Sequence, residues 1–168
     1  MTTVWYGRTA SGEGAAAQLR LQRHDCARLV AHRQPYTACY FDIGVGYRPG
    51  RPARRLDPHT VAAIGLPYAG GMAQLLHDAA NPGRPFDRVV CFDLARVSRR
   101  AQVVSDVIDH LVAAQMDLLV PPVADLLTVE GTAAQRFAAT FALMVLQADH
   151  AHRAGHRSAQ PIAGEDRQ

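Results

Sequence analysis

Short runs of β-forming residues alternate with amphipathic helical segments along most of this chain. Four such runs predict strands, at residues 3–8, 36–41, 86–94 and 116–120. Between them, apolar residues recur at helical spacing over residues 15–32, 71–80 and 101–115. A helix between two strands carries the chain back across the sheet, so that the second strand can run parallel to the first. The sequence therefore predicts an α/β fold. We expect a single domain with a mainly parallel sheet of four to five strands flanked by helices.

A long C-terminal helix is expected over residues 132–153, where Phe137, Phe141 and Met144 recur at helical spacing. Two interpretations stay open for it: a core helix of the same domain, or a helix that forms a dimer. Residues 154–168 are polar and are expected to be disordered. The domain is therefore expected to span residues 1–153.

The length of 168 residues suits one domain, and the net charge of +3 comes from arginines without any lysine. This modest basic excess permits an acidic partner such as nucleic acid but does not require one. The sequence contains neither a signal peptide nor a stretch long and apolar enough to span a membrane. We expect a soluble, cytoplasmic protein without a membrane partner.

Motifs for nucleotides and metals are missing from the sequence. There is no P-loop, no GxGxxG after a strand, no HExxH and no paired Cys/His spacing, so we expect no cofactor and no metal. Cys26, Cys39 and Cys91 are widely spaced among apolar neighbours and are expected to be reduced and structural.

Arginines stand at the ends of two predicted strands. Arg8 ends the first strand, and Arg96, Arg99 and Arg100 follow the strand at 86–94. Ligands of open parallel sheets bind at the carboxyl ends of strands, and guanidinium groups that converge there suit a phosphodiester. Helix-capping and solvated arginines are an equally good interpretation of the spacing alone.

The segment at about 47–66 is rich in arginine and proline and lacks a core-forming pattern. We favour a solvated insertion over an arm in which Arg54 and Arg55 contact DNA, although the second interpretation stays open.

Several segments resemble, in order, the motifs of resolvase/invertase-type serine recombinases. Tyr6-Gly-Arg8 resembles their Tyr-x-Arg-x-Ser start, and residues 18–23 (QLRLQR) resemble their Ser-Leu-x-x-Gln-Arg helix. Residues 42–46 (DIGVG) look like their Asp-x-Gly-x-Ser-Gly loop, and residues 71–79 (GMAQLLHDA) like their Gly-Leu-x-x-Leu-Leu-x-x-Ala helix. Residues 87–99 are similar to their strand and Leu-Asp-Arg-Leu-Ser-Arg signature, and Gly131-Thr132 to the start of their dimerisation helix.

The resemblance covers residues 3–153 and implies the fold of a recombinase catalytic domain, with DNA as a partner. In that family a serine two positions after the first arginine attacks the DNA phosphate, and here this position is Ala10. Ser11 is adjacent, but a shift of one residue on an extended segment moves a side chain by about 3.3 Å and turns it to the other face. A family arginine is replaced by Ala69 and a family aspartate by Ala95.

The family residues that the chain retains, as the resemblance implies, are Arg8, Gln22, Asp42, Arg96 and Arg99, with Tyr6 in support.

Two hypotheses about function follow. In the first, the chain exchanges DNA strands with Ser11 as a displaced nucleophile and with Arg8, Arg96 and Arg99 as catalytic arginines. In the second, the chain is a catalytically inert module of the recombinase fold that binds DNA or regulates an intact recombinase. Three altered positions favour the inert version, because binding groups do not form the covalent bond. A decayed remnant of a mobile element is a third, weaker interpretation.

The resemblance also implies a homodimer or heterodimer through residues 132–153. In that family a DNA-reading domain follows the helix; we expect this chain to lack one and therefore to need a partner for targeting to a DNA sequence.

Overall fold

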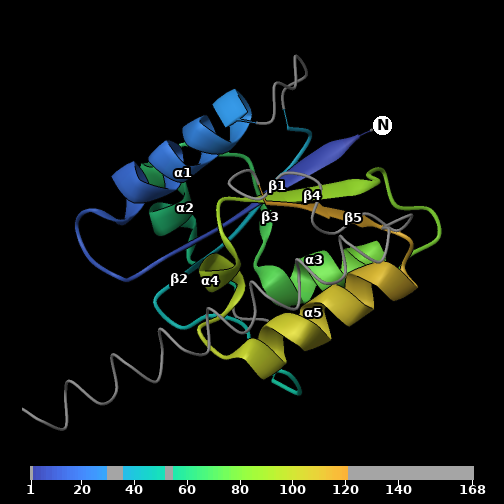
Figure 1. Cartoon of the computed structure of the whole chain (residues 1–168). Helices are drawn as coiled ribbons and strands as arrows, with labels where there is room; N and C mark the ends of the chain where they lie inside the picture. Colours follow the sequence, from blue (N-terminus) through green and yellow to red (C-terminus); the bar gives the residue numbers. More distant parts are fainter. Residues whose placement is uncertain (1, 30–35, 52–54, 121–168) are drawn as a thin grey trace, which may run out of the picture.

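The computed structural model describes residues 2–29, 36–51 and 55–120, which form a five-stranded sheet with helices on both faces (Figure 1). The strands are β1 (Thr3–Thr9), β2 (Cys39–Ile43), β3 (Tyr68–Gly70), β4 (Arg88–Cys91) and β5 (Asp117–Leu119). The helices are α1 (Ala15–Leu29), α2 (Pro58–Ile64), α3 (Met72–Ala79), α4 (Leu94–Val97) and α5 (Ala101–Ala113).

Every neighbouring pair of strands is parallel, and the strand order is β3-β2-β1-β4-β5. The chain builds the sheet outward from β1 through β2 to β3, then crosses back and adds β4 and β5 on the other side of β1. The direction of winding therefore reverses between β1 and β4. A crevice forms at such a switch point, outside the carboxyl ends of the strands, and ligands bind there in open α/β sheets.

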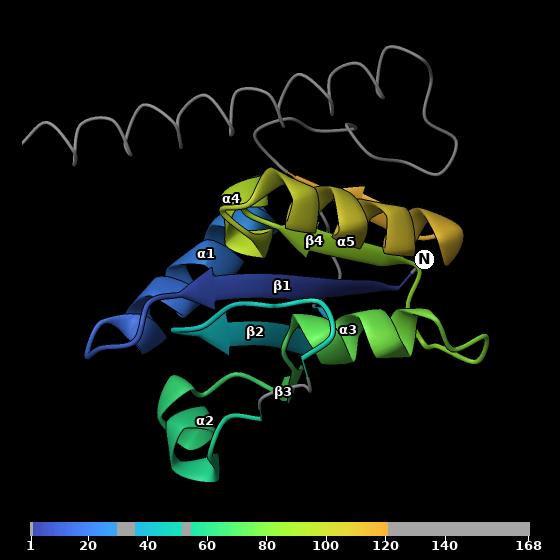
Figure 2. The same ribbon diagram turned by 90° about the horizontal axis from the view of Figure 1, so that it is seen from below.

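Alternate residues of β1 belong to two different cores. Trp5 is buried with Leu19 of α1 and Ile64 of α2 on one face. Val4 and Tyr6 point to the other face, where they pack among residues of α3, α4 and α5. Figure 2 shows the helices on the two sides of the sheet. Since successive side chains of a strand point to opposite faces, a central strand between two helical layers is apolar on both sides.

The predicted α/β fold with a parallel sheet is confirmed, and β1, β2, β4, β5, α1, α3 and α5 lie within or close to their predicted ranges. The strand predicted at 86–94 was too long, because β4 ends at Cys91 and Leu94 begins α4. The reason is local: Asp93 caps α4 by accepting a hydrogen bond from the backbone N–H of Arg96 at 3.0 Å.

Three elements, α2, β3 and α4, were not predicted. Helix α2 lies inside the segment at 47–66, begins after the cap Asp57 and ends at Gly65 with φ of 68°. Strand β3 contains Ala69 and forms the edge of the sheet beside β2. The helix predicted at 132–153 and the tail at 154–168 lie outside the described residues.

We predict that Gly7→Ala destabilises the fold. A Cβ atom at residue 7 would lie 2.1 Å from Cη2 of the Trp5 ring, which is fully buried. The ring has to move within a packed core, so the free energy of unfolding should fall by about 1–3 kcal/mol. Chemical denaturation measures this difference.

The matched control is Gly14→Ala, because no heavy atom lies within 4 Å of a Cβ at that position. It should change the free energy of unfolding by no more than about 0.5 kcal/mol. Equal effects of the two substitutions would contradict the close approach of the Trp5 ring to Gly7.

Candidate functional site

A cavity of about 510 Å³ opens at the carboxyl ends of the strands, beside the switch point. The end of β1, the loop after β2 and the loop between α4 and α5 line it together with Val103 of α5. Five of its lining residues are arginines: Arg8, Arg48, Arg51, Arg99 and Arg100. None of the described residues that line it is acidic. Its volume lies in the range of ligand sites, and its charge suits an anion.

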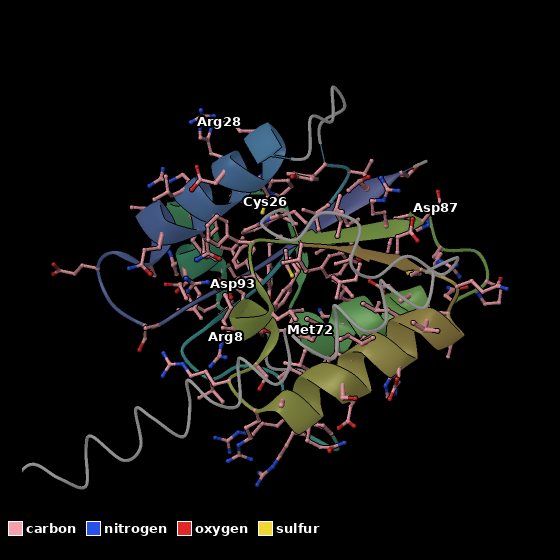
Figure 3. All side chains as sticks on the ribbon, viewed as in Figure 1. Arg8, Cys26, Arg28, Met72, Asp87 and Asp93 are labelled. Carbon is pink, nitrogen blue, oxygen red and sulfur yellow. The ribbon has the colours of Figure 1, made fainter. Side chains whose placement is uncertain are left out.

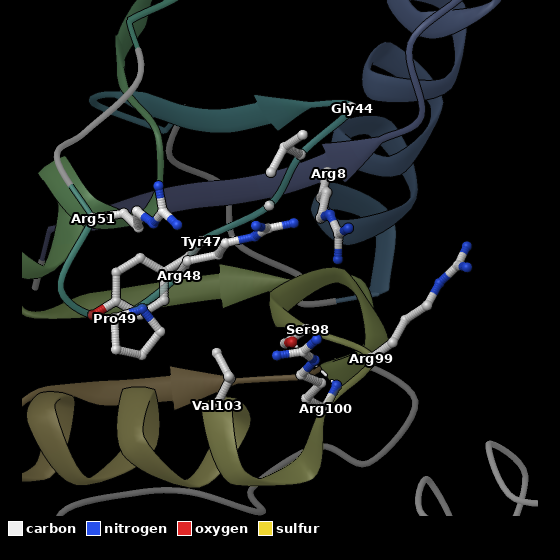
Figure 4. A pocket seen from close by; sticks show the side chains of 12 residues that line it. Arg8, Gly44, Tyr47, Arg48, Pro49, Arg51, Ser98, Arg99, Arg100 and Val103 are labelled. Carbon is white, nitrogen blue, oxygen red and sulfur yellow. Dashed lines mark hydrogen bonds between the residues drawn. The ribbon is translucent and has the colours of Figure 1, made fainter.

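The arginines reach this cavity from three separate segments (Figure 4). Arg8 comes from β1, and Arg48 extends toward it from the loop after β2. Arg99 extends away from the others. Like charges that face one space repel each other, so an anion that enters between Arg8 and Arg48 would relieve that repulsion.

The backbone of Arg8 is held by a side chain. β4 ends opposite Tyr6, so the N–H and C=O of Arg8 have no strand neighbour on that side. The Gln22 amide takes this place: its Oε1 accepts from the Arg8 N–H at 3.3 Å, and its Nε2 donates to the Arg8 C=O at 3.1 Å. Because Gln22 is buried on α1, it fixes Arg8 relative to that helix.

The guanidinium group of Arg8 lies against the loop after β2. A Cβ atom at residue 46 would lie 2.7 Å from both Cζ and Nε of Arg8, so a side chain there would push the guanidinium group away from this position. The chain turns into this loop at Gly44, whose φ of 78° is in the left-handed region. The loop therefore forms one wall against which the Arg8 side chain is placed.

A second, partly buried group, Asp42 at the end of β2, connects three elements. Its Oδ2 accepts a hydrogen bond from the Tyr6 hydroxyl at 2.9 Å and one from the backbone N–H of Met72 at 3.0 Å. The second bond satisfies the N-terminus of α3, where Gly71 provides no capping side chain. Asp42 thus links β1, β2 and α3 below the cavity, and its charge is directed toward the helix.

Burial is the largest influence on Asp42 and raises the pKa of its carboxyl, while the bonds from Met72 and Tyr6 and the charge of Arg8 lower that pKa. Because the folded-state pKa is raised, the contribution of Asp42 to stability is present below its ordinary pKa and is lost as pH rises through the raised value. Burial, followed by the charge of Asp42, raises the pKa of Tyr6 well above its ordinary value. The Tyr6 hydroxyl therefore keeps its proton and stays a donor.

Arg96 is not among the residues that line the cavity. Its Nε donates to Oδ2 of Asp93 at 3.2 Å, and its backbone N–H donates to Oδ1 of the same carboxylate. The predicted arginines therefore separate: the structure brings Arg8, Arg99 and Arg100 to one cavity, and Arg96 pairs with Asp93.

Ser11 is exposed just past β1 and lies next to the cavity rather than among its lining residues. Its Cβ and Oγ lie 3.7 Å from where a Cβ of Gly44 would be, and Gly44 does line the cavity. Ala10 is exposed, Ala69 is exposed in β3, and Ala95 is partly buried in α4. Arg55 is exposed before α2 and does not line the cavity, and Arg54 lies outside the described residues.

Arg48 and Arg51 were missed as site residues by sequence reasoning, because the stretch around them was interpreted as part of a solvated insertion. Their position in the sequence could have identified them, because both follow β2 and its Gly44–Gly46 turn, at the same sheet edge as Arg8. Ser98, also missed, lines the cavity, and its Oγ accepts the backbone N–H of Arg100 at 3.1 Å.

The described residues contain no group of three or more His, Cys, Asp or Glu placed to hold a metal ion. Within the same residues, no helix is long and apolar enough to cross a membrane.

No protein-family model matches the sequence, and no curated protein gives a significant match. Solved structures do match. The structure is similar to the N-terminal catalytic domain of TP901-1 integrase, with a TM-score of 0.51 and 17% identity, over 92% of this chain and 98% of that one. It is also similar to the C-terminal catalytic domain of ISC1926 TnpA, an IS607-like serine recombinase, with a TM-score of 0.50 and 16% identity, over 71% of this chain and 67% of that one. The chain therefore has the fold of serine recombinase catalytic domains.

We predict that Tyr6→Phe raises the pKa of Asp42 further, because the carboxylate loses a donor that favours its charged form. NMR of the Asp42 carboxyl carbon as a function of pH measures this pKa. Tyr40→Phe is the matched control, since it removes a hydroxyl that bonds to Asp78 at 2.8 Å instead. A pKa of Asp42 that shifts equally in both variants would show that the Tyr6 bond is not the cause.

Proposed function

We propose that this chain binds the phosphodiester backbone of DNA non-covalently, as a recombinase-fold module whose catalysis is impaired or absent. The observation that carries the proposal is the cavity with five arginines and no acidic lining residue in the described part of the chain. Its position at the switch point of a parallel sheet adds support.

The chemistry of the cavity favours phosphate over other anions. Each guanidinium is a planar group of donors that matches two oxygens of one phosphate, and it stays charged at any physiological pH. Arginines that arise from three segments, such as Arg8, Arg48 and Arg100, surround an extended polyanion better than a single small anion. Binding of this kind releases counterions, so affinity should fall steeply with salt.

The proposed loss of catalysis rests on the nucleophile. Ala10 offers no group that attacks phosphorus, and arginines position and polarise a phosphate without forming the covalent bond. Gln22 holds the backbone of Arg8, and Asp42 connects β2 to Tyr6 and to α3, whether or not a nucleophile is present.

An active strand-exchange enzyme is the second candidate, and the place of Ser11 favours it. Ser11 lies against Gly44 at the border of the cavity, so a rearrangement of residues 10–14 would bring its Oγ toward a phosphate held there. Arg8 and Arg99 would then stabilise the charge on phosphorus, and Arg96 would have to leave Asp93 to take part.

The other parts of the proposal concern the chain as a whole. We propose a catalytic-type domain over residues 1–153, and a homodimer, or a heterodimer with an intact recombinase, through residues 132–153. In the heterodimer the intact partner would supply both the nucleophile and the reading of a DNA sequence. The inert chain would add phosphate contacts.

We predict that Arg8→Gln weakens binding to duplex DNA roughly tenfold, the loss expected for one charge-assisted phosphate contact. The dependence of log K on log salt should also become shallower by about one unit. Fluorescence anisotropy with a labelled duplex at several salt concentrations measures both.

The matched control is Arg28→Gln, because Arg28 is exposed on α1 and points away from the sheet (Figure 3). It should leave the affinity almost unchanged. Equal losses in the two variants would mean that net charge alone, rather than the cavity, attracts DNA.

Incubation with supercoiled DNA distinguishes the two candidates. We predict neither nicked product nor a protein-DNA adduct that survives denaturation. An adduct that disappears in Ser11→Ala would establish the active enzyme in place of the inert module.

A further inference from the structure

We infer that Asp93 is a positioning residue. Its carboxylate pairs with the Arg96 guanidinium, as a DNA phosphate would, and so keeps Arg96 out of the DNA-binding cavity. This inference rests on the proposed function, since it concerns which arginines are available to the DNA backbone. It adds one residue with a defined role, Asp93, for which the sequence motifs gave no indication.

The geometry of the pair supports this role. Both carboxylate oxygens of Asp93 face Arg96: Oδ1 accepts the backbone N–H at 3.0 Å, and Oδ2 accepts the Nε–H at 3.2 Å. An Nε–H that donates to Asp93 is one of the donors with which an arginine binds a phosphate oxygen. The carboxylate therefore competes with DNA for this guanidinium.

The location of Asp93 makes this competition relevant. It lies two residues after Cys91, which pairs with Tyr6, and Arg8 lies two residues after Tyr6 on the neighbouring strand. Asp93 and Arg8 are thus at the same end of the sheet, with Asp87 at the other end of β4 (Figure 3). Helix α4, which Asp93 caps, is followed directly by Ser98, and Ser98 lines the cavity.

The pair is weak enough to be exchanged. The side chains of Arg96 and Asp93 are 38% and 35% exposed, so solvent screens their attraction. A phosphate with two accessible oxygens and a full charge is a comparable partner for the guanidinium. Removal of the Asp93 charge should therefore strengthen DNA binding by about three- to fivefold, the upper part of the range expected for one exposed ion pair.

Asp93→Asn is the sharpest substitution, because asparagine is as good a helix cap as aspartate. Its side-chain oxygen still accepts the Arg96 N–H, so α4 is preserved, and only the charge that pairs with Nε is lost. Circular dichroism and thermal unfolding check that the fold is unchanged.

The experiment measures duplex affinity by anisotropy for the wild-type chain, Asp93→Asn, Arg96→Gln and the double variant Asp93→Asn/Arg96→Gln. We expect Asp93→Asn to gain three- to fivefold over the wild type. We expect the same substitution to give no gain in the Arg96→Gln background, because no guanidinium is then released. Asp87→Asn removes the same charge from an exposed residue at the far end of β4 and should give little gain.

Four outcomes would overturn the inference. A gain that persists in the Arg96→Gln background would show a general effect of charge, and so would an equal gain from Asp87→Asn. No gain in Asp93→Asn, with binding still dependent on Arg8, would show that Asp93 does not withhold Arg96, and the proposed function would stand. Binding that is insensitive to Arg8→Gln would instead remove the proposed function, and this inference with it.

Discussion

The central strand β1 extends past the end of its neighbour β4, and the site depends on how this extra length is held. A strand that loses its neighbour leaves backbone donors and acceptors unpaired, which is costly in a buried position. The Gln22 amide pairs with both groups of Arg8, and on the next residue the Thr9 hydroxyl bonds to Gln18, one turn earlier on α1. Helix α1 therefore carries Arg8 to the edge of the sheet, where the cavity opens.

Two carboxylates balance the arginines of this edge in different ways. Asp42 is directed at Tyr6 and the N-terminus of α3, so it stabilises the junction of β1, β2 and α3 without lining the cavity. Asp93 pairs with Arg96 on α4. Both negative charges are engaged beside the cavity, and the arginines within it have no acidic partner among its described lining residues. An anion from solution, in our proposal a DNA phosphate, takes that role.

The sequence predicted the fold where a pattern was long enough to show. Helix α5 has clear periodicity because it is buried along one face, and β1 shows a run of β-forming residues because it is buried on both faces. Helix α2 has seven residues and buries Ile64 alone, so its signals were only the cap Asp57, Pro58 and the terminal Gly65. In the site, the motifs indicated Arg8, but they could not show that Arg96 pairs with Asp93 or that Arg48 turns back toward Arg8. Those facts depend on side-chain contacts across a turn and between loops.

The most direct test of the account is NMR of the arginine Nε–Hε groups during titration with a short DNA duplex. Binding in the cavity predicts that the signals of Arg8 and Arg48 shift together and saturate at one affinity. The signals of Arg96 and of Arg28 should move little, since the first is paired with Asp93 and the second is on the far side of α1. Shifts at Arg28 that equal those at Arg8, or no shift at Arg8 while DNA is bound, would contradict the account.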